Sequence, residues 1–136
     1  MNEKSLVLPR KELACARRSL RAAETLMDHE LYEDAISRAY YAVLHASKAA
    51  LATVDVFPST HQSVRRLFGL HLVKTNRIER EYATILTSEQ EDRELSDYDI
   101  TISIEQERAN QRVMDARRFV DRIEHYLSSI EGKNPS

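Results

Sequence analysis

An arginine and a histidine on one helical segment are the residues whose types and spacing best suit chemistry. Arg38 and His45 are seven positions apart in an alanine-rich stretch, so at 3.6 residues per turn they share a helix face with Tyr41 and Lys48. Arginine could hold a phosphate group, and a histidine with a pKa near about 6.5 could exchange a proton. The alternative is structural: Arg38 would be buried against a carboxylate of another helix, with His45 at the core boundary.

A second candidate group lies within an acidic stretch farther along the chain. Residues 93–98 read Arg-Glu-Leu-Ser-Asp-Tyr and stand where a later helix is expected to end. Helix ends carry exposed, precisely placed side chains more often than helix middles do, so Arg93, Asp97 and Tyr98 are candidate site residues. The alternative is that Arg93 is the centre of a local ion-pair network, because acidic residues surround it in the sequence.

The remaining polar residues give weaker signals. His61 and His71 are ten positions apart and do not share a helix face. No spacing of His, Asp or Glu is typical of a metal site, and glycine is too scarce for a phosphate-binding loop, so we expect no metal and no cofactor. The single Cys15 is interpreted as a small core residue. Three basic groups are interpreted as solvated helix faces: Arg17, Arg18 and Arg21; Arg65 and Arg66; and Arg108 and Arg112.

Length and composition limit the class of protein. We expect the 136 residues to form a single helical domain, with frayed ends at about 1–8 and 131–136. A net charge of −2 excludes a globally basic nucleic-acid binder but allows local basic patches. No apolar run approaches about 18 residues and the N-terminus lacks a signal segment, so we expect a soluble, cytoplasmic protein without a membrane partner.

Apolar residues recur at helical spacing along most of the chain, and glycine and proline are rare. The predicted helices cover about 9–30 and 32–54, a shorter segment from a cap at Thr60 to about 74, a segment from a cap at Thr75 into the acidic stretch, and one from a cap at Ser103 to about 130. Helices joined by short connections pack side by side. The predicted fold is therefore all-α, an antiparallel up-and-down bundle of four long helices plus one short helix.

Three sequence blocks, taken together and in order, resemble the HEPN domain superfamily. They are residues 37–46, residues 60–75 and residues 93–99. The likeness is greatest to the small stand-alone prokaryotic HEPN proteins and spans about residues 11–127. It implies a helical bundle that is frequently dimeric, and that is often encoded beside a minimal nucleotidyltransferase as a toxin–antitoxin pair.

The resemblance also implies a reaction, because catalytic members are metal-independent ribonucleases. Their hallmark is an arginine followed, after four to six residues, by a histidine near a helix end. Arg93 matches the arginine best, and Tyr98 stands where the histidine is expected. Tyrosine, with a pKa of about 10, is a poor proton shuttle at neutral pH. Arg38 and His45 have the literal spacing but lie in the middle of a predicted helix.

We therefore predict a HEPN-fold module of a nucleotidyltransferase-linked, toxin–antitoxin-like system. It would act as a homodimer, bind RNA or nucleotide, and cleave RNA without a metal if it is an enzyme. Arg38 and Arg93 would hold phosphate, His45 would move the proton, and Asp97 and Tyr98 would orient them. The alternative is a non-catalytic dimeric protein-interaction module in which both arginines are buried and structural.

Overall fold

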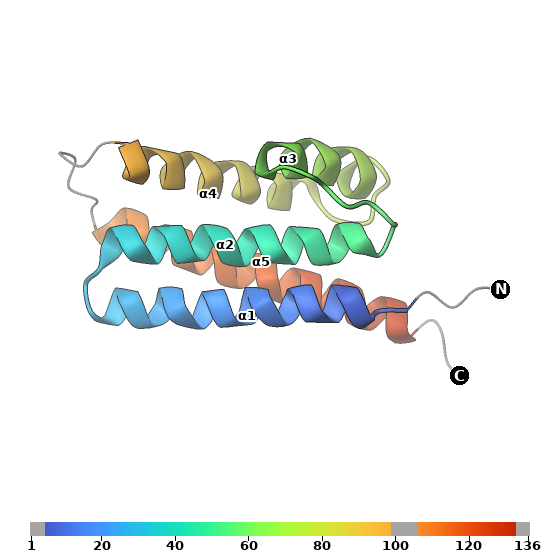
Figure 1. Ribbon diagram of the computed structural model, residues 1–136, viewed down its shortest axis with the longest axis horizontal. Helices are drawn as coiled ribbons and strands as arrows, with labels where there is room; N and C mark the ends of the chain where they lie inside the picture. Colours follow the sequence, from blue (N-terminus) through green and yellow to red (C-terminus); the bar gives the residue numbers. More distant parts are fainter. Residues whose placement is uncertain (1–4, 99–105, 133–136) are drawn as a thin grey trace.

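The computed structural model describes residues 5–98 and 106–132, without the side chains of residues 95–98. Every regular element in these ranges is helical (Figure 1). The elements are α1 (Val7–Asp28), α2 (Tyr32–Ala52), α3 (His61–Phe68), the π-helical turn η1 (Gly69–Val73), α4 (Arg80–Tyr98) and α5 (Gln106–Gly132). The predicted all-α bundle of four long helices and one short helix is confirmed. Within the described ranges, no helix combines the length and apolarity that crossing a bilayer requires.

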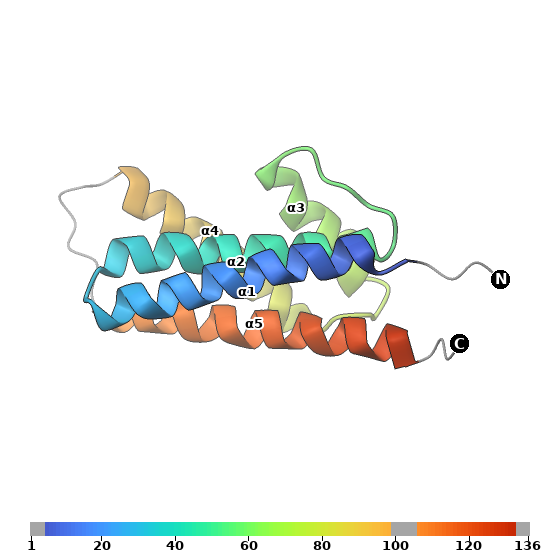
Figure 2. The same ribbon diagram turned by 60° about the horizontal axis from the view of Figure 1, so that its bottom comes forward.

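Helix α2 is the centre of the bundle. It packs against each of the other helices, with α1 and α4 antiparallel to it on opposite sides (Figures 1 and 2). Helix α3 packs on α2 and α4 but not on α1 or α5, so it forms an outer layer on one side of the bundle (Figure 2). The space where α2, α3 and α4 meet is therefore bordered by three segments that are distant in the sequence.

The composition of α2 explains why this helix lies at the centre of the bundle and why one of its faces still reaches the surface. From residue 39 to residue 52 every position is buried except Tyr41, His45 and Lys48, which are half-buried. Alanine at many of the buried positions lets neighbouring helices approach closely, while Tyr40 fills a larger space at 1 % exposure. The polar stripe predicted on this helix is thus the part of α2 that reaches the surface.

Residues with left-handed backbone follow α1, α2 and η1. They are Glu30 (φ 60°), Asp55 (φ 59°) and Asn76 (φ 62°). This conformation lets the chain turn back onto the last carbonyl groups of the preceding helix, as in the 2.9 Å bond from Leu31 N to Leu26 O. Glycine usually occupies such positions. With only two glycines in the chain, the sequence did not mark these helix ends.

The predicted helix caps differ in outcome. Thr60 is confirmed, because its hydroxyl accepts a hydrogen bond from the Ser63 N–H at 3.1 Å. Thr75 is wrong as a cap, because its hydroxyl donates to the carbonyl of His71 at 2.7 Å and so belongs to the end of η1. Helix α4 begins later, at Arg80. The predicted cap at Ser103 lies outside the described residues.

A buried carboxyl group lies between α4 and α5. Glu89 has no exposed surface, and neither of its carboxyl oxygens has a hydrogen-bond partner. Burial raises its pKa well above the ordinary 4.5; Arg112 opposes the shift, and Asp115 and Asp92 add to it. Arg112 itself is paired with Asp115 at 3.1 Å and with Asp92 at 3.5 Å. Glu89 is therefore kept in its neutral form at a pH where a solvated glutamate is ionised.

We expect Glu89→Gln to stabilise the protein at pH 8 and to have much less effect at pH 4. The unfolded chain loses this proton near pH 4.5 and the folded chain loses it at a higher pH. Since the folded state binds more protons between those values, wild-type stability falls as the pH rises through that window. Each unit of pKa difference corresponds to about 1.4 kcal/mol. Urea unfolding at both pH values measures the difference.

The matched control is Glu91→Gln, because Glu91 is an exposed residue of the same helix. This variant should show no comparable gain at pH 8. Equal behaviour of the Glu89 and Glu91 variants at both pH values would contradict the buried, neutral state of Glu89.

Candidate functional site

Four side chains from α2, α3 and α4 gather on the open side of α2. They are Tyr40 and Tyr41 of α2, His61 of α3 and Arg93 of α4, and we call them the arginine–tyrosine cluster. Each helix contributes because α3 and α4 both pack against α2. The cluster is the place where the polar stripe of α2 meets the second candidate segment of the sequence.

Arg93 is held by two consecutive tyrosines. Its Nη2 donates a hydrogen bond to the Tyr41 hydroxyl at 3.1 Å. Its Cζ lies 5.5 Å from the ring centroid of Tyr40 and 5.5 Å from that of Tyr41, within the range of cation–π attraction. The side chain is half-buried, so part of it still reaches solvent. The result is a guanidinium group whose position is fixed by two rings and a hydrogen bond.

His61 completes the cluster from the first position of α3. Its ring centroid lies 6.2 Å from the centroid of each tyrosine ring, in edge-to-face orientation. Partial removal from water lowers its pKa below 6.5, and the positive charges of Lys48, Arg93 and His45 lower it further. His61 is therefore neutral at pH 7 and can accept a proton.

His45 lies beside the cluster, and a carboxylate of another helix orients its ring. Its Nδ1 is 3.0 Å from a carboxylate oxygen of Glu12 in α1. Because a carboxylate only accepts hydrogen bonds, the Nδ1 proton faces Glu12 and the second ring nitrogen remains for proton transfer. A carboxylate bound to one ring nitrogen fixes the orientation of the histidine, so that the other nitrogen is positioned for proton transfer.

Arg38 is exposed, which contradicts its interpretation as a buried structural residue. It makes no ion pair with the described side chains. Asp97 and Tyr98 lie in the last turn of α4, but their side chains are outside the described residues. Their roles, and that of Arg38, stay predictions.

His61 was not among the residues predicted for the site. It was judged only by its spacing from His71, and the structure relates it instead to two tyrosines of another helix. One signal was present: Thr60 is a confirmed cap, and a residue directly after a cap begins a helix in a fixed position. The approach of that helix end to α2 depends on tertiary packing, which spacing along the chain does not reveal.

The chemistry of the cluster suits an anion. Arg93 and Lys48 supply positive charge, and Tyr40, Tyr41 and His61 supply hydrogen-bonding groups and flat rings. A phosphodiester next to an unpaired base matches these groups, because arginine binds phosphate and aromatic rings stack on bases. Among the described residues, no group of three or more His, Cys, Asp or Glu side chains is placed to hold a metal ion.

Comparisons with known proteins agree with the fold. A protein named "Putative toxin MJ0605" from Methanocaldococcus jannaschii is 39% identical over 115 residues, which cover 85% of each chain. A second protein of that organism, "Putative toxin MJ0142", is 33% identical over 122 residues, covering 88% of this chain and 83% of the relative. A "UPF0332 protein" of Thermotoga maritima is 28% identical over 131 residues, covering 96% and 98%. The sequence model of the HEPN domain matches residues 11–126. The chain therefore belongs to the HEPN domain family.

Proposed function

We propose that this protein binds single-stranded RNA at the arginine–tyrosine cluster and cleaves it without a metal ion. The observation that carries the proposal is the position of Arg93, held by Tyr41 and next to a histidine whose pKa is lowered by partial burial and neighbouring charges. Family membership supports it, since the sequence blocks that resemble HEPN domains include Arg93 and His61.

Arg93 holds the scissile phosphate in this proposal. Its guanidinium is fixed by two rings and a hydrogen bond, so little side-chain freedom is lost when a phosphate binds. Lys48 adds positive charge on the same side of α2, and Arg38 lies farther along that helix face for the next phosphate. Asp97 and Tyr98, in the last turn of α4, orient the bound strand.

Two histidines move the protons. His61 accepts the proton of the 2′-hydroxyl, and the 2′-oxygen attacks phosphorus to form a 2′,3′-cyclic phosphate. The bond to the 5′-oxygen breaks, and that oxygen leaves with the Nε2 proton of His45, which enters the reaction protonated on both ring nitrogens and whose Nδ1–H is held by Glu12. The two rings then exchange protons with water. Arg93 stabilises the charge that develops on the phosphate oxygens.

The partners follow from the family and its relatives. We propose a homodimer that pairs with a minimal nucleotidyltransferase in a toxin–antitoxin-like system. The relatives named as toxins support this assignment, because they match this chain over most of their length. In such a pair the cleavage of RNA would be the toxic activity and the nucleotidyltransferase would restrain it.

The test is incubation of the purified protein with labelled single-stranded RNA in EDTA. We expect fragments that end in 2′,3′-cyclic phosphate and 5′-hydroxyl groups, because no metal or water takes part in the bond-breaking step. RNA in which every 2′-hydroxyl is replaced by 2′-O-methyl should bind and stay intact. Absence of cleavage, or cleavage of the 2′-O-methyl RNA, would contradict the proposed reaction.

A further inference from the structure

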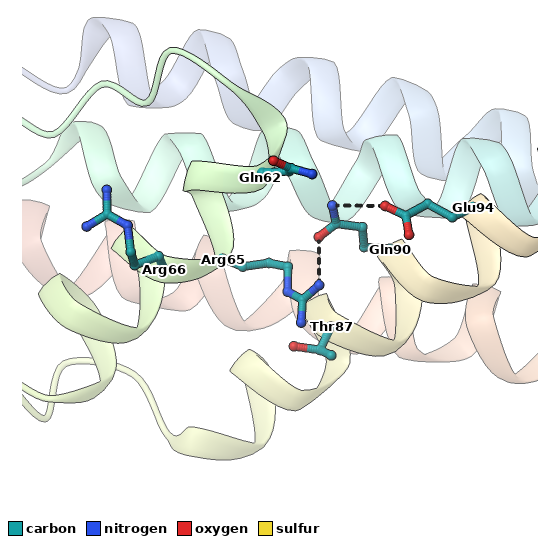
Figure 3. Close-up of a pocket in the computed structure, with 6 residues that line it drawn as sticks. All are labelled: Gln62, Arg65, Arg66, Thr87, Gln90 and Glu94. Carbon is teal, nitrogen blue, oxygen red and sulfur yellow. Dashed lines mark hydrogen bonds between the residues drawn. The ribbon is translucent and has the colours of Figure 1, made fainter.

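A polar pocket between α3 and α4 borders the arginine–tyrosine cluster. It has a volume of about 580 Å³ and is lined by Gln62, Arg65, Arg66, Thr87, Gln90 and Glu94 (Figure 3). Gln62 directly follows His61 in the chain, and Glu94 directly follows Arg93, so the pocket and the cluster adjoin on both helices. Burial raises the pKa of the Tyr40 hydroxyl, on which the charges of Arg65 and Glu94 also act. Tyr40 therefore lies at the border between the two.

The pocket contains a buried amide with hydrogen-bonding capacity to spare. Arg65 reaches from α3 to α4, where its Nη1 donates to Oε1 of Gln90 at 3.4 Å. Gln90 in turn donates to Glu94, also at 3.4 Å (Figure 3). Both distances exceed the usual 2.7–3.2 Å of such bonds. Gln90 is only 5 % exposed, so its amide is held in place but is weakly engaged.

The lining favours a ligand that carries negative charge and a flat hydrogen-bonding edge. Two arginines face one glutamate, which leaves an excess positive charge. Arg65 points toward Gln90 and Thr87, whereas the guanidinium of Arg66 lies apart from them (Figure 3). A volume of 580 Å³ is within the range of small-molecule sites, about 300–1,000 Å³. A nucleotide offers both features, because its phosphate carries negative charge and its base has a flat hydrogen-bonding edge.

We propose that this pocket binds one unpaired nucleotide of the RNA, next to the phosphate held by Arg93. Arg65 contacts the phosphate of that nucleotide, and the amide of Gln90 pairs with the edge of its base. The inference rests on the proposed function and adds a source of sequence preference to it. Binding at the cluster alone would be insensitive to sequence, because arginine contacts to phosphate carry no base information.

The experiment measures binding of labelled 2′-O-methyl RNA hexamers of A, C, G or U by fluorescence anisotropy at several salt concentrations. Arg65→Ala should weaken binding of all four by about tenfold and lower the slope of log K against log salt by about 0.7, the value for one lost contact to a single strand. Gln90→Met, similar in size, should keep the slope and bring the four affinities to within about twofold.

Two controls make the result specific. Arg21→Ala removes an exposed arginine of α1, a helix that does not touch α3 or α4, and should change neither the slope nor the preference. Arg65→Lys should keep the wild-type slope. Circular dichroism melting of each variant shows that the fold is retained.

Two outcomes overturn the inference in different ways. If Arg65→Ala behaves like Arg21→Ala, or the base preference survives Gln90→Met, the pocket is not a nucleotide site, although the proposed function stands. If Arg93→Ala binds the hexamers as the wild type does, the proposed function itself fails, and the inference fails with it.

Discussion

We expect His61→Gln to lower the rate constant of RNA cleavage by about 100- to 10,000-fold and to leave RNA affinity nearly unchanged. This is the range expected when a positioned general base is removed. Glutamine keeps a polar side chain at the start of α3 but cannot accept the 2′-hydroxyl proton. Single-turnover cleavage in EDTA measures the rate, and anisotropy with 2′-O-methyl RNA measures the affinity.

The pH dependence gives an independent readout of the same role. Because partial burial and the charges of Lys48, Arg93 and His45 lower the pKa of His61, the base is unprotonated at pH 7. The acid limb of the wild-type profile should therefore lie below pH 6.5, and this limb should be absent from the residual activity of His61→Gln. His125→Gln, at an exposed histidine of α5, is the matched control. A His61 variant as active as the His125 variant would contradict the role.

We expect Arg93→Ala to weaken RNA binding by about 10- to 100-fold. A charged hydrogen bond to phosphate is worth about 1.5–3 kcal/mol, and the side chain that makes it is held by Tyr40 and Tyr41. Arg93→Lys should recover part of the affinity, since it restores charge without the planar fork. Anisotropy titrations at fixed salt measure these changes.

A structural role for Arg93 predicts a different pattern. The cation–π contacts that Arg93→Ala removes are worth about 0.5–2 kcal/mol, so some loss of stability accompanies the loss of binding. Tyr41→Phe separates the loss of stability from the loss of binding, because it deletes the 3.1 Å hydrogen bond and keeps the ring. If Arg93→Ala lowers the melting temperature and binds RNA as tightly as Arg21→Ala, the arginine serves the fold alone.

Much of the fold follows from local rules. The apolar stripes of the helices are amphipathic patterns of period 3.6, and they predict the number and order of the helices. The cap at Thr60 is also local, because its partner Ser63 is three residues away. The start of α4 was missed for a physical reason: Asn76 adopts a left-handed backbone, and Thr75 turns back to the preceding turn.

The site was predictable only in part. Spacing alone placed Tyr41, His45 and Lys48 on one face of α2, and those are its half-buried positions between residues 39 and 52. Arg93 was identified as a candidate, but its contact with Tyr41 joins residues 52 positions apart and depends on how α4 rotates against α2. The place of His61 likewise depends on the position of α3 across α2. These are relations between helices, which no pattern within one helix contains.

We propose that RNA phosphate binds where α2, α3 and α4 meet. The most direct measurement is an NMR titration of isotopically labelled protein with single-stranded 2′-O-methyl RNA, following the Arg93 guanidinium and the His61 ring. We predict that these two signals, with those of Tyr41 and Lys48, shift together and saturate at one common affinity. Shifts centred on the arginines of α1, with the Arg93 and His61 signals unmoved at saturation, would show that RNA does not bind at the arginine–tyrosine cluster.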